Sequence, residues 1–136
     1  MSISFELSGP SFIGFMVRDL AVSAEFYEKT LGLRRDPEGF KAPGNAVSFL
    51  TYPLPIALTQ APPGMDLDSI PRPIRFPAIW FKTANSQVVH DSLVAAGVTI
   101  LRAPTEARFG KQFTFADPDG YAITIYDRDA PADGWA

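Results

Sequence analysis

The amino-acid sequence predicts an α+β fold made of two tandem units, each with the element order βαβββ. A strand-like apolar run followed by an amphipathic helix occurs near the start of the chain and again after residue 76. The two copies keep a nearly constant spacing, because Asn85 follows Asp19 by 66 residues and Gly97 follows Gly32 by 65. Either copy alone would bury too small a core, so we expect the two halves to share one.

In the first unit, residues 11–17 (SFIGFMV) are apolar at both alternating sets of positions, which is typical of a strand covered on both faces. A helix is expected next, because Asp19 is a good N-cap and Gly32 can take the left-handed conformation that ends a helix. The apolar positions of this helix are Val22, Phe26 and Tyr27. Three extended stretches follow, at about 33–36, 46–52 and 54–60.

The second unit repeats this order after a proline-rich stretch that is expected to be a linker or a surface loop. Its first strand is predicted at 77–83, and its helix is expected to run from the N-cap Asn85 to Gly97, with Val89, Leu93 and Ala96 on the inner face. Extended stretches are expected at about 98–102, 111–116 and 121–127. We therefore expect a first module at 8–61, a linker at 62–75, a second module at 76–128 and a C-terminal tail at 129–136.

One turn is specific enough to predict by type. Residues 117–120 read Asp-Pro-Asp-Gly, with Asp at the first position, Pro at the second and Gly at the fourth, which is typical of a type I turn. This turn is expected to join the last two strands of the second unit tightly.

Composition excludes several classes of protein. The formal net charge of -3, the pI near 5.0 and the scattered basic residues do not favour a nucleic-acid partner. The chain has no cysteine, so disulfides, thiolate metal sites and cysteine nucleophiles are absent. No segment is typical of a signal peptide or a membrane span, so we expect a cytoplasmic protein with no membrane partner.

Two segments resemble a known family. Residues 12–33 (FIGFMVRDLAVSAEFYEKTLGL) and 113–127 (FTFADPDGYAITIYD) are similar to the opening and closing signatures of the glyoxalase/bleomycin resistance protein/dioxygenase superfamily, also called the vicinal oxygen chelate superfamily. The resemblance covers about residues 10–128. It implies that the two modules form a curled mixed sheet with a central cleft, and that the protein is a homodimer.

The resemblance also implies four positions at which catalytic members hold a divalent metal with His and Glu. These positions fall on Phe12, Ala57, Ala78 and Thr124. Phenylalanine and alanine offer no donor atom, and a lone threonine hydroxyl is a poor ligand. The only histidine, His90, lies inside the second helix, where we interpret it as a helix side chain with no catalytic role. We therefore predict no metal and no cofactor, and we do not expect metal-dependent glyoxalase or dioxygenase activity.

The remaining side chains of the expected cleft are mostly apolar and aromatic, which favours a small-molecule ligand. Trp80 is the leading contact, with a core or dimer-interface position as the alternative. Arg108 and Lys111, in the stretch EARFGKQ, are candidates for an anionic or carbonyl-rich ligand. The full predicted set of ligand-binding residues is Phe12, Met16, Thr59, Trp80, Lys82, Arg108, Lys111, Thr124 and Tyr126.

The predicted function is metal-independent binding or sequestration of a small aromatic or hydrophobic molecule, such as an antibiotic, as in the bleomycin-binding members that the chain resembles. The alternative is a metal-independent lyase or isomerase that uses Lys82, Tyr126 or Glu106 for acid–base chemistry. A third possibility is a structural role, in which Phe12, Met16 and Trp80 fill the cleft themselves.

Overall fold

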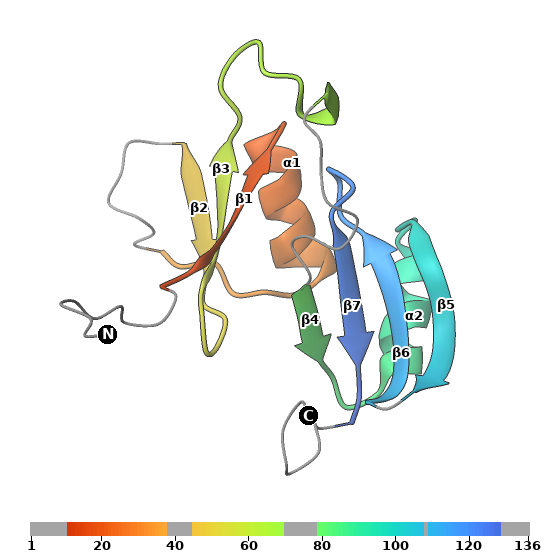
Figure 1. Ribbon diagram of the computed structural model, residues 1–136. Helices are drawn as coiled ribbons and strands as arrows, with labels where there is room; N and C mark the ends of the chain where they lie inside the picture. Colours follow the sequence, from red (N-terminus) through yellow and green to blue (C-terminus); the bar gives the residue numbers. More distant parts are fainter. Residues whose placement is uncertain (1–10, 38–44, 70–78, 108, 129–136) are drawn as a thin grey trace, which may run out of the picture. The chain divides into compact units, whose positions relative to one another are not determined.

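The computed structural model describes residues 11–37, 45–69, 79–107 and 109–128 of the chain (Figure 1). The chain divides into two compact units, Met1–Leu67 (unit 1) and Asp68–Ala136 (unit 2). The boundary falls inside the proline-rich stretch, where a short 3-10 helix, η2, spans Leu67–Ser69. Of the described helices, none has the length and apolar character needed to cross a bilayer.

Unit 1 contains a three-stranded sheet in the order β1-β3-β2, in which β1 is parallel to β3 and β2 is antiparallel to it. Its elements are β1 (Ile13–Val17), α1 (Leu20–Glu25), the π-helical turn η1 (Phe26–Thr30), β2 (Ala46–Phe49) and β3 (Ile56–Gln60). The predicted strand at 33–36 is reduced to a single bridge between Arg35 and Phe49. Two backbone hydrogen bonds flank this bridge, from the Asp36 N–H to the Ser48 carbonyl and from the Leu50 N–H to the Arg34 carbonyl.

The predicted first helix forms over the expected range. The Asp19 carboxylate accepts a hydrogen bond from the Val22 N–H at 3.2 Å, and the chain turns away at Gly32 with φ +74°. Tyr27 is fully buried and stacks on Phe15 of β1. Val22 is exposed, because the face of the helix that packs on the sheet is formed by Tyr27 and by the small side chains of Ser23 and Ala24.

Unit 2 repeats this plan with one more strand. Its sheet has the order β4-β7-β6-β5, with β4 parallel to β7 and the other pairs antiparallel. The elements are β4 (Ile79–Lys82), α2 (Ser86–Ala95), β5 (Ile100–Ala107), β6 (Gly110–Ala116) and β7 (Ala122–Tyr126). In both units the first strand pairs in parallel with the last, so the duplicated unit predicted from the sequence is confirmed.

One face of the unit 2 sheet is buried and packs against α2. The buried side chains are Ile79, Phe113, Phe115, Ile123, Ile125 and, from the helix, Leu93. These residues alternate along their strands, as expected for a sheet with one covered face. The opposite set of side chains, called the helix-free face below, is exposed or half-buried.

The predicted turn between β6 and β7 is confirmed. Asp117 Oδ1 accepts hydrogen bonds from the N–H groups of Asp119 and Tyr121, at 2.9 and 2.8 Å. Gly120 has φ +89°, which a side chain would disfavour. This turn fixes Ala116 opposite Ala122, and therefore the register of β6 and β7 in the site described below.

Two of the three described left-handed glycines of unit 2, Gly97 and Gly110, provide a matched test of this packing. A Cβ at Gly110 (φ +81°) would overlap the Asp127 carboxylate and crowd the Arg128 backbone, whereas one at Gly97 (φ +80°) would meet no atom. Gly97→Ala is expected to destabilise the fold by about 1–2 kcal/mol, from backbone strain alone. Gly110→Ala is expected to lose about 2 kcal/mol more, from steric overlap. Urea unfolding of both variants measures the difference, and equal losses would contradict the structure around Gly110.

Candidate ligand-binding site

The register of unit 2 places polar and aromatic side chains in two rows across the helix-free face. Residues that are paired across strands point to the same side of a sheet. The first row is Trp80, Thr124, Thr114 and Arg102, and the second row is Lys82, Tyr126, Gln112 and Thr105. Four of the predicted ligand-binding residues, Trp80, Lys82, Thr124 and Tyr126, therefore lie together on one face.

Three rings form an aromatic cluster on this face. The ring centroids of Trp80 and Tyr126 are 5.9 Å apart, and Phe109, in the turn between β5 and β6, lies 6.1 Å from each of them. The interplanar angles are 56° to 87°, so the rings pack edge to face or tilted. Trp80 keeps 41% of its surface exposed. The cluster therefore offers ring surface that a planar ligand can cover.

A pair of hydroxyl groups lies beside the aromatic cluster in the first row. Thr114 Oγ1 and Thr124 Oγ1 are 2.8 Å apart and share one hydrogen bond, in which either oxygen can be the donor. Each hydroxyl has one proton to donate and lone pairs to accept, so the pair retains capacity for one further partner. This pair can orient a ligand that stacks on Trp80.

The residues present do not fit the divalent metal of the catalytic members of the family. The Thr124 hydroxyl is engaged with Thr114, the Ala57 methyl is fully buried in β3, and the Phe12 ring lies over Gly14. Ala78, the fourth position, lies outside the described residues. No group of three or more His, Cys, Asp or Glu side chains gathers within the described ranges.

Unit 1 carries the predicted residues Phe12, Met16 and Thr59. Met16 and Thr59 are register partners in β1 and β3, and both are exposed. The Thr59 hydroxyl donates a long hydrogen bond of 3.4 Å to the Phe15 carbonyl. Phe12, just before β1, is 47% exposed. These side chains lie on the face of the unit 1 sheet opposite the buried Phe15 and Val17.

Two predicted residues lie on the helix side of unit 2 instead. Lys111 Nζ donates to the Gln87 side chain of α2 at 3.3 Å, and Glu106 stands opposite Lys111 in the register. The structure therefore does not bring Lys111 together with Trp80, or Glu106 together with Lys82 and Tyr126. Arg108 lies outside the described residues.

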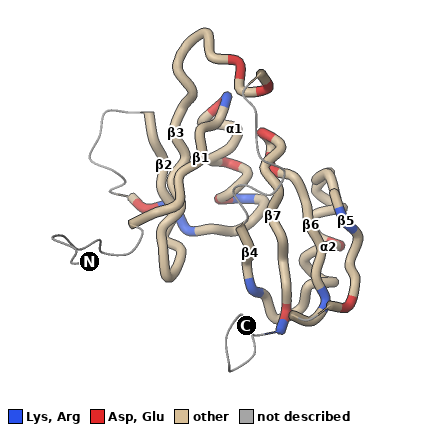
Figure 2. The backbone as a smooth tube through the Cα atoms, in the orientation of Figure 1, with Lys and Arg blue, Asp and Glu red and all other residues tan. Residues whose placement is uncertain are grey.

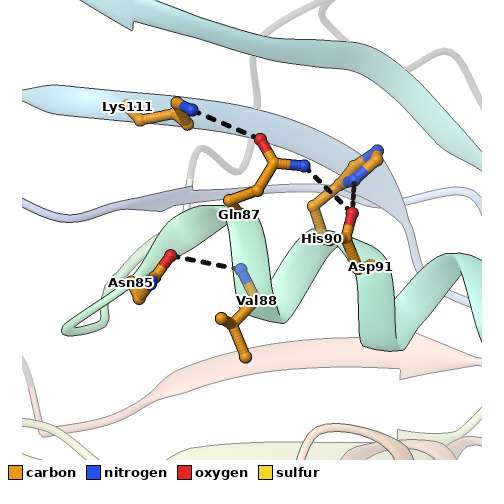
Figure 3. A network of polar contacts seen from close by, with 6 residues as sticks. All are labelled: Asn85, Gln87, Val88, His90, Asp91 and Lys111. Atoms are coloured by element: carbon orange, nitrogen blue, oxygen red, sulfur yellow. Dashed lines mark hydrogen bonds and ion pairs between the residues drawn. The ribbon is translucent and has the colours of Figure 1, made fainter.

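Lys111 belongs to a chain of polar contacts that ties α2 to β6 (Figure 3). Gln87 Nε2 donates to Asp91 Oδ1 at 2.9 Å, and His90 Nδ1 lies 3.0 Å from the same oxygen. The hydrogen bond from His90, followed by that from Gln87, lowers the pKa of Asp91 below its usual value. The His90 ring packs edge-on against Phe113, which places it on the helix side, away from the aromatic cluster.

A separate cavity of about 650 Å³ lies in unit 1 on the α1 side. Its walls include Ala24, Val47 and Gln60, and the ion pair between Glu28 and Arg35 at 3.2 Å. The Gln60 side chain also has hydrogen-bond partners, because it accepts a hydrogen bond from the Leu20 N–H and donates one to the Arg18 carbonyl. Three polar side chains of this cavity, Glu28, Arg35 and Gln60, are thus engaged within unit 1, and its walls hold no aromatic ring, so we take the helix-free face of unit 2 as the candidate site for an aromatic ligand.

Arg102, Phe109, Gln112 and Thr114 were missed by the sequence analysis. Thr114 and Gln112 could have been found, because a tight turn at 117–120 places Ala116 opposite Ala122 and so aligns Thr114 with Thr124 and Gln112 with Tyr126. Phe109 lies in a turn whose course no sequence pattern predicts. Arg102 depends on a register irregularity in β5.

Comparison with known proteins shows the family to which the chain belongs. The family model of the glyoxalase/bleomycin resistance protein/dioxygenase superfamily matches residues 9–125, so the chain belongs to this superfamily. The resemblance and the βαβββ fold predicted from the sequence are thereby confirmed. No curated protein matches the chain.

Several solved structures share the fold. A glyoxylase/bleomycin resistance protein/dioxygenase domain from Frankia sp. is 25% identical, with a TM-score of 0.69 and coverage of 93% of this chain and 96% of that one. A family enzyme from Burkholderia phytofirmans is 18% identical, with a TM-score of 0.69 and coverage of 86% and 96%. The fosfomycin resistance protein FosX from Listeria monocytogenes is 19% identical, with a TM-score of 0.69 and coverage of 91% and 96%.

Asp127 holds the aromatic cluster in place. Its carboxylate accepts from the Ser86 N–H at the start of α2 and from the Lys111 N–H of β6, at 3.2 and 2.9 Å. Its backbone N–H donates to the Phe109 carbonyl, and Tyr126 is its chain neighbour. The hydrogen bond from Ser86 is the main cause that lowers the pKa of Asp127, and burial opposes it.

Asp127→Asn is expected to destabilise the fold at neutral pH but not in acid. Because folding lowers the pKa of Asp127, its carboxylate stabilises the folded state above about pH 4, and this contribution is lost as the pH falls through the folded pKa. The urea midpoints of wild type and variant should therefore converge as the pH falls below the folded-state pKa of Asp127. Glu106→Gln, an equal charge change on an exposed side chain, serves as the control. A constant difference at all pH values would contradict the assigned role.

Proposed function

We propose that this protein binds a small planar aromatic molecule on the helix-free face of unit 2 without the help of a metal. The observation that carries the proposal is the aromatic cluster of Trp80, Phe109 and Tyr126, with half-buried to exposed rings, beside the Thr114–Thr124 hydroxyl pair. Stacking supplies affinity and the hydroxyl pair supplies orientation. Binding or sequestration is then the activity.

The side-chain types at the family's metal positions support the metal-independent part of the proposal. A carbon-only side chain cannot replace an imidazole or a carboxylate, so Phe12 and Ala57 remove two of the four expected ligands. We also propose a homodimer, which the family resemblance implies. An antibiotic as the ligand and a cytoplasmic location stay predictions, as does the catalytic alternative through Lys82, Tyr126 or Glu106.

Trp80→Ala is expected to weaken binding of the neutral probe 2-naphthamide at least about tenfold, because stacking on an indole face is removed. The fold is expected to survive, since Trp80 is half-exposed and its two ring contacts contribute about 1 kcal/mol each. Calorimetric titration measures the affinity, and circular dichroism checks the fold. Val88→Ala, an apolar truncation on the exposed side of α2, is the control. An unchanged affinity in folded Trp80→Ala would remove Trp80 from the site.

Divalent metals are expected to leave the protein unchanged. The melting temperature should not rise with Zn²⁺, Mn²⁺, Ni²⁺ or Fe²⁺, and chelator should not alter the affinity for 2-naphthamide. An organic ligand at 100 times its Kd should, by contrast, stabilise the fold by about 2.7 kcal/mol. Elemental analysis of the purified protein completes the test. A stoichiometric metal, or a clear rise in melting temperature with one of these ions, would overturn the metal-independent proposal.

A further inference from the structure

Two cations of the described unit 2 strands, Arg102 and Lys82, lie on the helix-free face. Arg102 of β5 pairs with Thr114, and Lys82 of β4 pairs with Tyr126, so the register places both on the side of the aromatic cluster. Figure 2 marks basic positions in blue on both β4 and β5. The two cations occupy the opposite edge strands of the sheet. A ligand on this face therefore lies between two positive charges.

The carboxylates described in the unit 2 sheet lie elsewhere. Glu106 stands opposite Lys111, whose ammonium reaches α2, and the Asp127 carboxylate accepts from the Ser86 N–H at the start of α2. Asp117 is buried in the turn between β6 and β7. None of these anions shares the helix-free face with Arg102, so no described carboxylate of the sheet offsets the Arg102 charge there.

Arg102 reaches this face because β5 is irregular. Ile100 pairs with Phe115, which is buried on the helix side, and strict alternation would place Arg102 on that side too. The register shifts between Ile100 and Arg102, so Arg102 pairs with Thr114 on the helix-free face instead. Such bulges re-aim single side chains and are common beside binding sites.

Arg102 is exposed, and no ion pair or side-chain hydrogen bond joins it to another described residue. Arg35 in unit 1, by contrast, is held by Glu28 at 3.2 Å. In the first row, Arg102 and Trp80 are separated by three strand intervals, which is about 14 Å between Cα atoms. An arginine side chain that leans inward covers part of this span. Its guanidinium can then meet a group near the Thr114–Thr124 pair.

We propose that the ligand of this face is an aromatic anion, and that Arg102 binds its oxyanion. The aromatic ring lies against Trp80 and Tyr126, and a carboxylate or similar group a few bonds away meets the guanidinium of Arg102 and the hydroxyls of Thr114 and Thr124. A guanidinium binds a planar carboxylate with two parallel hydrogen bonds, which gives it both affinity and orientation. This inference rests on the proposed function and adds the charge class of the ligand.

The test uses three probes with the same ring system and different charge, namely 2-naphthoate, neutral 2-naphthamide and (naphthalen-2-yl)methylammonium. Calorimetric titration of the wild-type chain at low salt should give affinities in the order anion, amide, cation, with about a tenfold preference for the anion over the amide. Arg102→Gln should remove this preference by weakening the binding of 2-naphthoate more than that of 2-naphthamide. Arg34→Gln, the same charge change in unit 1, should retain it.

The outcomes separate this inference from the proposed function. If 2-naphthoate and 2-naphthamide bind equally well, or if Arg102→Gln keeps the preference, the inference is wrong while aromatic binding stands. If none of the three probes binds, or if binding is unchanged in Trp80→Ala, the proposed function is wrong and the inference falls with it. Loss of the preference in Arg102→Gln alone, with Arg34→Gln unaffected, supports the assignment.

Discussion

The register of β7 is the constraint on which the rest of unit 2 depends. β7 pairs in parallel with β4 and antiparallel with β6, and the Asp117 carboxylate fixes the turn that enters it. A slip of one residue would turn Ile123 and Ile125 away from the core and bring Thr124 and Tyr126 into it. Burial of the isoleucines against α2 opposes that slip, so the same force that stabilises the core also presents the binding face.

The sequence could predict the elements of the fold because each is marked by local chemistry. Asp19 and Asn85 cap their helices, Gly32 and Gly97 take left-handed conformations after them, and both helices formed where these signals placed them. Local chemistry could not predict how far a strand pairs. The stretch before Pro37 is extended as expected, but whether it becomes a strand depends on partners that are distant in the sequence.

Strand alternation predicted the site only as far as the register was regular. Trp80, Lys82, Thr124 and Tyr126 follow from alternation along β4 and β7, and the structure brings them together. Lys111 was assigned by its place in a charged stretch, yet its neighbours Phe113 and Phe115 are buried on the helix side, and alternation sends Lys111 to that side as well. The position of Arg102 on this face could be predicted only with knowledge of the bulge in β5. That bulge depends on pairing with β6 and has no signature in a single sequence.

The separation of charge between the two faces explains why bulk composition is a poor guide to the ligand. The chain as a whole carries a formal charge of -3, which would favour a cationic partner if charge were spread evenly. The carboxylates of the unit 2 sheet are instead engaged where they stabilise the fold, at the start of α2 and in the turn before β7. Hydrogen bonds from backbone N–H groups hold these carboxylates at those places. At the proposed site the local charge of Arg102 therefore matters more for the choice of ligand than the sign of the total charge.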